Sequence, residues 1–352
     1  MAQPQRKRIF IDVGVNLTDP VFRGMHRGKR QHPDDFAAVI ARAKAAGVEQ
    51  QIITGGSLNE SRAALKLANE NGFFATTGCH PTRSSEVGKM PEGQYMRQLD
   101  KLIADNIYRP GEGIKGRCVA VGECGLDYDR LFRAGKQDQQ RAFRAQLVMA
   151  KKYHLPLFLH NRNSHADFVA LLTEAGMHID GGRAVGGRGG VVHSFTGEAE
   201  EMEEFVSMGY YISVNGCSMK TERQLEMIKR IPLDKLLLET DAPWCSLTGG
   251  HASKEHLALL PQHLRKLFIP LATQPERWEE GKAVRGRNEP CAIGSVAFVV
   301  ARLKGVHLNE VAEKAYQNTL DCFNLQESDV LGHPSTEGAS TSTSAPAAST
   351  SG

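Results

Sequence analysis

The sequence has no apolar run of about 20 residues, which a membrane-spanning helix requires, so we expect no membrane partner. The start, residues 1–8, is polar and basic and does not resemble a secretory signal. Seven cysteines include no C-x-x-C pair, which argues against a disulfide framework and a structural zinc site. We therefore expect a chain of a reducing compartment, the cytosol or the nucleus.

The sequence also has little net charge and gives no signal for an obligate protein partner. A net charge of +3 is too small to concentrate a polyanion over the whole molecule, so any nucleic-acid contact should be local. What the chain does have is 352 residues that are 41% hydrophobic and 24% charged. These values are typical of a globular enzyme with one large core.

Short apolar runs alternate with longer stretches of helical spacing, which is typical of a parallel α/β fold. The predicted strands are Ile9–Val15, Gln51–Thr54, Phe73–Gly78, Cys118–Gly122, Leu157–His160, Gly190–His193, Tyr210–Val214 and Leu236–Glu239. The predicted helices are Asp34–Ala46, Leu58–Asn71, Gln94–Asn106, Lys136–Tyr153, Ser164–Ala175, Ala199–Met208 and Thr221–Arg230. Eight strands close a barrel, so the fold class is α/β and the architecture a (β/α)8 TIM barrel.

The chain is expected to form one domain with two polar ends. Residues 1–8 are a polar extension, residues 9–326 the barrel, and residues 327–352 a disordered tail rich in Ser, Thr and Ala. Two insertions, Tyr108–Arg117 and Phe268–Arg287, are expected to be surface loops.

Four predicted strands end on, or just before, a side chain that can bind a metal: Glu123, His160, His193 and Asp241. The carboxyl ends of barrel strands meet at one rim, where such enzymes place their active sites. Two imidazoles and two carboxylates suit a divalent cation such as zinc, manganese or magnesium. Such a cation activates water, so hydrolysis follows more naturally than redox chemistry.

Several motifs in one order resemble the TatD-type metal-dependent deoxyribonucleases of the amidohydrolase-like barrel superfamily. They are Phe-Ile-Asp-Val-Gly-Val-Asn-Leu-Thr from Phe10, Gly-Cys-His-Pro from Gly78, Val-Gly-Glu-Cys-Gly-Leu-Asp from Val121, Phe-Leu-His-Asn-Arg from Phe158, Val-Val-His-Ser-Phe from Val191 and Leu-Glu-Thr-Asp-Ala-Pro-Trp from Leu238. The resemblance runs from Ile9 to Leu325.

The resemblance implies roles for six residues. Glu123, His160, His193 and Asp241 are the metal ligands, with Glu123 able to bridge two ions. His80 and Arg162 lie near the scissile phosphate, and Arg162 can hold its oxygens through a planar guanidinium.

The first strand departs from the pattern of the wider superfamily. It carries Asp12-Val13-Gly14-Val15-Asn16 where that superfamily has Asp-x-His-x-His, so a second ion is expected to be held more weakly, by a substrate phosphate, waters, Asp12 or Asn16. Glu123 stands where other barrel hydrolases have a carbamylated lysine. The later segment Arg287–Pro290 resembles the family's post-barrel segment and is expected to pack the last loop, with contact to substrate as the alternative.

The sequence thus predicts a deoxyribonuclease that hydrolyses phosphodiester bonds with one or two divalent ions, magnesium first and manganese or zinc as alternatives. The expected substrate is DNA, with single strands or frayed ends as possible forms. Asp241 is the candidate general base and Glu123 the second catalytic residue. Two alternatives stay open: a metal-dependent hydrolase of small amides or esters, and a non-catalytic binding protein on the same barrel.

Overall fold

The computed structural model describes residues 8–111 and 116–331. Most of the predicted N-terminal extension, part of the Tyr108–Arg117 insertion and residues 332–352 of the predicted tail lie outside the described residues.

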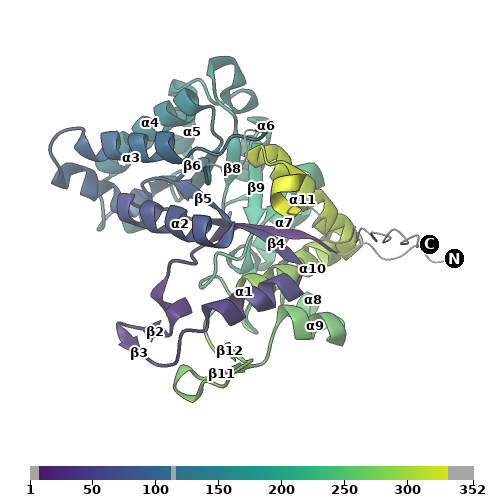
Figure 1. The fold of residues 1–352 in the computed structure, drawn as a ribbon. Coiled ribbons are helices and arrows are strands. Elements are labelled where there is room, and N and C mark those ends of the chain that lie inside the picture. Colours follow the sequence, from purple (N-terminus) through teal and green to yellow (C-terminus); the bar gives the residue numbers. More distant parts are fainter. Residues whose placement is uncertain (1–7, 112–115, 332–352) are drawn as a thin grey trace, which may run out of the picture.

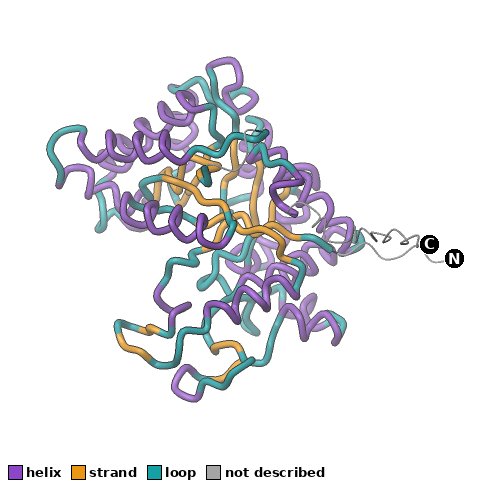
Figure 2. Tube along the Cα trace, in the orientation of Figure 1, coloured by secondary structure: helices purple, strands orange, loops and turns teal. Residues whose placement is uncertain are grey.

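Eight parallel strands form one sheet at the centre of the molecule, in the order β1-β4-β5-β6-β7-β8-β9-β10. Their bounds are β1 (Phe10–Val15), β4 (Val48–Ile53), β5 (Phe74–Thr77), β6 (Cys118–Asp127), β7 (Leu157–Arg162), β8 (Gly190–Val192), β9 (Tyr211–Val214) and β10 (Leu236–Leu238). Figure 2 shows these strands in orange, surrounded by helices. The prediction of eight strands and a TIM-like barrel is confirmed, although β6 and β7 extend beyond their predicted ends.

The sheet closes into a near-complete barrel between β1 and the residues after β10. The Asp241 amide donates to the Gly14 carbonyl at 2.8 Å, and the Asn16 amide donates to the Ala242 carbonyl at 2.7 Å. These bonds bring the carboxyl ends of the first and last strands together, and with them the loop that carries Asp241.

Helices pack around the barrel (Figure 1). Their bounds are α1 (Phe36–Ala45), α2 (Leu58–Asn71), α3 (Gln94–Asn106), α4 (Lys136–Tyr153), α5 (His165–Glu174), α6 (Ala199–Ser207), α7 (Glu222–Arg230), α8 (Lys254–Ala258), α9 (Gln262–Phe268), α10 (Ile293–Lys304), α11 (Leu308–Phe323) and α12 (Glu327–Leu331). The ends of α2 show why the sequence folds this way: the Ser57 side chain accepts from the Glu60 amide, and left-handed Gly72 ends the helix.

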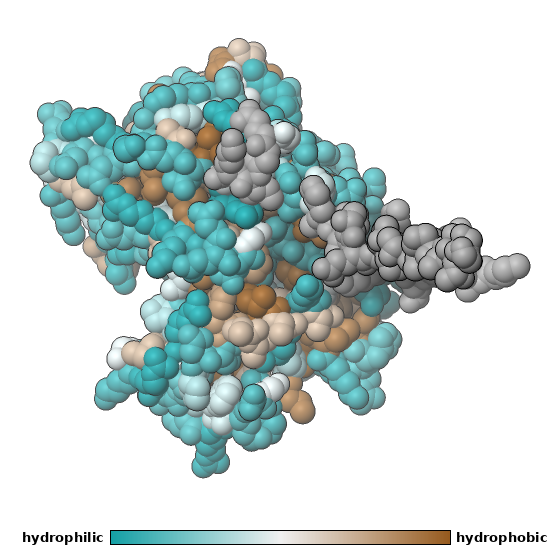
Figure 3. Space-filling model, viewed as in Figure 1, coloured by the Kyte–Doolittle hydropathy of each residue, from teal (hydrophilic) through white to brown (hydrophobic). Residues whose placement is uncertain are grey.

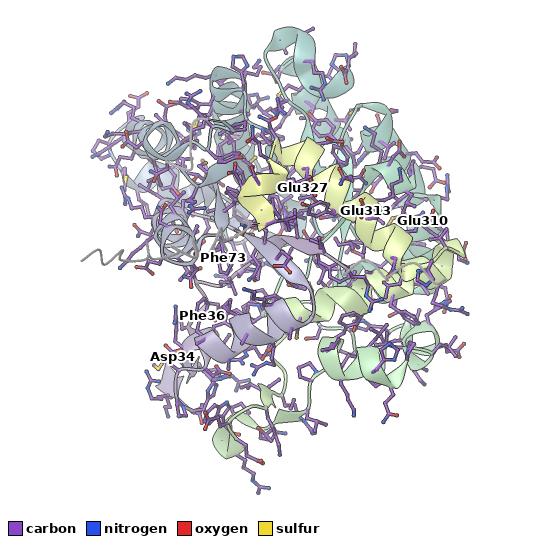
Figure 4. The ribbon with its side chains drawn as sticks, turned by 45° about the vertical axis from the view of Figure 1, so that its right-hand side comes forward. Asp34, Phe36, Phe73, Glu310, Glu313 and Glu327 are labelled. Carbon is purple, nitrogen blue, oxygen red and sulfur yellow. The ribbon has the colours of Figure 1, made fainter. Side chains whose placement is uncertain are left out.

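The interior of the barrel is apolar and is closed at the amino ends of the strands by α11 and α12. Phe323 and Val330 pack in the same cluster as Ile11, Ile52 and Phe74 from the strands. In Figure 4, Glu310 and Glu313 mark α11 and Glu327 marks α12, which cross in front of the strands. With this end filled, the carboxyl ends of the strands are the rim at which a site can form.

Two loop predictions need correction. The predicted tail begins inside α12, whose Val330 is buried because it packs against the barrel interior. The stretch Phe268–Arg287 is not simply a surface loop, because β11 (Ala272–Thr273) and β12 (Ala283–Val284) pair within it. Arg287 at its end is buried in ion pairs.

The face in Figure 3 is mostly hydrophilic, with paler apolar residues over α1, whose exposed positions include Ala37, Ala41 and Ala45. In the described part of the chain, no single helix is long and apolar enough to cross a membrane; only α10 with its preceding turn (Pro290–Lys304) and α11, bent by 112°, pass that test as a pair.

Candidate active site

Glu123 lies at the centre of the site because of an irregularity in β6. Gly122 pairs with Phe158 of β7 and Cys124 pairs with Leu159, so Glu123 between them has no partner on β7. A bulge of this kind redirects a side chain at the end of a strand. Gly122 permits it: a Cβ there would lie 2.2 Å from the Phe158 carbonyl oxygen.

Three imidazoles surround the Glu123 carboxylate. Its Oε1 lies 2.8 Å from His193 Nε2, 3.0 Å from His160 Nδ1 and 3.2 Å from His80 Nε2. His80 and His193 follow β5 and β8, and Glu123 and His160 lie within β6 and β7, so the barrel rim brings together residues more than 100 positions apart. His80, Glu123 and His160 form a candidate metal site, with ligand atoms within 4.8 Å of one another.

Burial and charge set the protonation of this cluster. Burial alone would raise the pKa of Glu123, but the neighbouring His80, His193 and His160 hold it well below its ordinary value. Burial would lower the pKa of His193, but the carboxylates of Glu123 and Glu239 raise it well above its ordinary value. Burial lowers the pKa of His80. Glu123 is therefore ionised, as a metal ligand must be.

The three histidines differ in what lies behind them. His160 Nε2 is 3.5 Å from Asp127 Oδ2, and His193 Nδ1 is 3.6 Å from Glu239 Oε1. A carboxylate on the far nitrogen is the usual arrangement around an imidazole that binds a metal. In the described chain, His160 Nε2, His193 Nδ1 and both Asp127 oxygens are buried without a hydrogen bond. This donor set fits a cation bound by the near nitrogens of both rings.

His80 is different, because its far nitrogen is already an acceptor. The Thr82 backbone amide donates to His80 Nδ1 at 3.1 Å. The Thr82 hydroxyl lies 2.7 Å from the same nitrogen. With Nδ1 accepting from the amide, Nε2 carries the ring proton and can donate to an anion. The geometry of His80 suits a donor to phosphate better than a metal ligand.

Asp241 follows β10 on the loop that closes the barrel. Asn16 donates to its Oδ1 at 2.8 Å, and the Cys245 thiol lies 3.3 Å from its Oδ2. Burial, together with the negative charge of Glu239, raises the pKa of Asp241 to about 7. Asp241 thus joins the cluster electrostatically through Glu123 and His193.

Arg162, the remaining predicted residue, lies apart from the imidazole cluster. Its Nε donates to Asp129 Oδ2 at 2.7 Å, and its side chain is half-exposed. It does not line the cleft described next.

A cleft of about 810 Å³ opens over Glu123 and His80. Its walls include Asn16 after β1, Phe132 and Arg133 after β6, and Trp244 after β10. Sequence reasoning assigned no role to these last three. The signal that could have found them is their position on loops after barrel strands, where binding residues gather.

Comparison with known proteins agrees with the motifs. The family described as TatD-related DNase matches residues 11–324. The deoxyribonuclease Tat-D of Schizosaccharomyces pombe is 43% identical over 316 residues, covering 89% of this chain and 95% of that protein. The 3'-5' ssDNA/RNA exonuclease TatD of Erwinia tasmaniensis is 33% identical, covering 90% and 100%.

A solved structure extends this agreement to the fold. The hydrolase TatD family protein of Entamoeba histolytica superposes with a TM-score of 0.78 at 32% identity, covering 90% of this chain and 98% of that one. The resemblance read from the sequence is confirmed: this chain belongs to the TatD-related DNase family.

Proposed function

We propose that this chain is a divalent-metal-dependent deoxyribonuclease that hydrolyses DNA phosphodiester bonds with water as the nucleophile. The observation that carries the proposal is the ionised Glu123 carboxylate among imidazoles at the base of a cleft that also holds arginines. Family membership and the deoxyribonuclease name of the relative from Schizosaccharomyces pombe support it.

Glu123, His160, His193 and Asp241 would hold the cation, and His160 and His193 each have a carboxylate behind them. When bound, a divalent cation makes a coordinated water more acidic and stabilises negative charge on phosphate oxygens. The two imidazoles suit zinc, and the two carboxylates suit magnesium and manganese, so we place zinc beside the magnesium expected from the sequence.

One tightly held ion suffices for this arrangement. Asp12, a candidate for a second site, is fully buried and accepts from the Thr240 amide at 2.9 Å. Burial raises its pKa to about 8, and the Thr240 amide and hydroxyl already donate to its two oxygens.

The remaining side chains bind and orient the substrate. His80 Nε2 donates to a phosphate oxygen, and Asp241 accepts the proton of the attacking water. Asp241→Asn, whose amide oxygen can still coordinate, should lower kcat by at least about 100-fold when enough metal is added to restore wild-type occupancy. A variant that keeps full rate with full occupancy would remove Asp241 from the base role.

The name of the Erwinia tasmaniensis relative directs the substrate test. It specifies single-stranded DNA and RNA and a 3'-5' exonuclease. We expect the present chain to shorten 5'-labelled single-stranded DNA into a ladder from the 3' end. Internal cuts in a circular single strand would instead make it an endonuclease. RNA of the same sequence, tested alongside, measures its preference for the sugar.

A further inference from the structure

Two aromatic side chains with exposed rings stand on the walls of the cleft. Phe132 is 79% exposed and Trp244 is 56% exposed, and both line the cleft over Glu123 and His80. Phe132 lies just after the 3-10 helix η3 (Tyr128–Arg130) that follows β6, and Trp244 lies on the loop after β10. Two loops distant in the sequence thus contribute a ring to the same space.

Core packing does not account for these rings. A ring that stays in water gains little from the hydrophobic effect, and single exposed apolar residues are ordinary on protein surfaces. Two exposed rings in one concave site, beside groups suited to phosphate chemistry, indicate a ligand with flat apolar faces.

The cleft also provides a cation next to one ring. The Arg133 guanidinium lies 5.6 Å from the centroid of the Phe132 ring. The other arginines of the cleft have carboxylate neighbours: Arg83 contacts Glu60 at 2.7 Å, and Arg130 lies 3.8 Å from Asp127. Among the described residues, no ion pair involves Arg133. Its charge is available to an anionic ligand.

The size of the cleft limits what enters. A volume of about 810 Å³ lies within the range of about 300–1,000 Å³ typical of small-ligand sites, so only a few nucleotides fit. Bases inside a duplex are stacked on one another and cannot present their faces to a protein ring. Unpaired bases can.

We propose that Phe132 and Trp244 stack on unpaired bases next to the scissile phosphodiester, and that Arg133 pairs with a phosphate of the same strand. This inference rests on the proposed function and defines its substrate as single strands and frayed ends. Because every base has a flat face, recognition by stacking is tolerant of sequence.

The test measures binding by the full-length chain in chelator, where strand binding is separated from cleavage. Fluorescence anisotropy gives the Kd of a labelled single-stranded 12-mer and of a matched strand that is abasic at every position and keeps its phosphates. The variants are Phe132→Leu, Trp244→Leu and Arg133→Gln. The matched controls are Leu131→Ala, an exposed apolar neighbour outside the cleft lining, and Arg141→Gln, an exposed arginine on α4.

We expect Phe132→Leu and Trp244→Leu each to raise the Kd for the normal strand by about 5- to 150-fold and to leave the abasic strand unchanged. Arg133→Gln should weaken both strands equally, and both controls should match the wild type. Equal wild-type affinity for the two strands, or leucine variants that behave like Leu131→Ala, would overturn the inference.

The two proposals fail separately. A chain that binds bases through these rings but cleaves no strand with any metal refutes the nuclease and supports the stacking site. A chain that cleaves DNA while its leucine variants bind and cleave like the wild type refutes only the stacking site.

Discussion

Replacing Arg287 by methionine should destabilise the fold strongly, because the substitution breaks a buried charge network. The Arg287 guanidinium donates to the two Asp35 oxygens at 2.7 and 2.6 Å, to Glu289 at 2.8 Å and to the Val21 carbonyl at 3.1 Å. All three charged side chains are at most 3% exposed.

The charge count gives the expected magnitude. Arg287 and Arg42 balance Asp35 and Glu289, because Arg42 Nε also contacts Glu289, at 2.7 Å. Without Arg287, two buried carboxylates share one guanidinium. Removing one partner of a buried pair costs about 3–5 kcal/mol, because the other charge stays buried without compensation. We expect Arg287→Met to lower the free energy of unfolding by this amount.

Urea unfolding followed by circular dichroism measures the effect, and the chain provides a matched control. Arg230 also contacts two carboxylates, Glu200 and Glu203, both at 2.8 Å, but its side chain is 43% exposed. Arg230→Met should cost much less than Arg287→Met, because exposed ion pairs contribute little to stability. The double variant Asp35→Asn with Arg287→Met restores the balance and should cost less than the sum of its single variants. Equal losses for Arg287→Met and Arg230→Met would refute the reasoning.

Two further predictions concern the site. His193→Gln should lose bound metal, whereas His80→Gln should keep it and lose at least about tenfold in kcat, because His80 acts as a donor. Metal analysis by mass spectrometry, together with steady-state rates, measures both effects. Equal metal loss in the two variants would contradict this prediction. The pKa of Asp12 is about 8 in the folded chain and 3.8 in the unfolded chain. Its contribution to the free energy of unfolding is therefore fully present below pH 3.8 and is lost as the pH rises through 8. Asp12→Asn should remove this dependence. In urea titrations, the free energy of unfolding of the variant minus that of the wild type should therefore rise from pH 5 to pH 8. A constant difference would count against a protonated Asp12.

The segment around Arg287 also connects stability to the site. The Asn288 amide donates to the Pro243 carbonyl, and the Asn288 side chain donates to the Thr240 carbonyl, both at 3.0 Å. These bonds hold the loop that carries Asp241. The expectation that Arg287–Pro290 packs the last loop is confirmed by these contacts.

Much of the barrel could be predicted because strands buried on both faces read as continuous apolar runs. The helices α2, α3 and α4 have the bounds predicted from their spacing. The long helices α10 and α11 were not predicted. They follow the eighth strand, so they lie outside the alternation of strands and helices from which the other helices were predicted. The pairing of β11 with β12 depends on contacts across an insertion, which local patterns do not encode.

The site was predictable only in part, for a related reason. Strand ends predicted that Glu123, His160 and His193 would converge, and their contacts with Glu123 agree with this. Alternation along a strand predicts on which face of the sheet a side chain lies but not which residue it contacts. The pairing of Arg162 with Asp129 could therefore not be predicted. The tautomer of His80 depends on the Thr82 amide, and the cleft walls depend on how separate loops meet.

The most direct test of the nuclease proposal is a metal add-back experiment on chelator-treated protein with end-labelled single- and double-stranded DNA. Magnesium, manganese and zinc are added singly, and bound metal is measured in the same samples. Wild type and Glu204→Gln, whose glutamate contacts His165 on the surface, should regain cleavage. Glu123→Gln should stay at least about 100-fold slower with every metal. Glu123→Gln cleaving at the wild-type rate, or a metal-loaded wild type that cleaves neither DNA, would contradict the account.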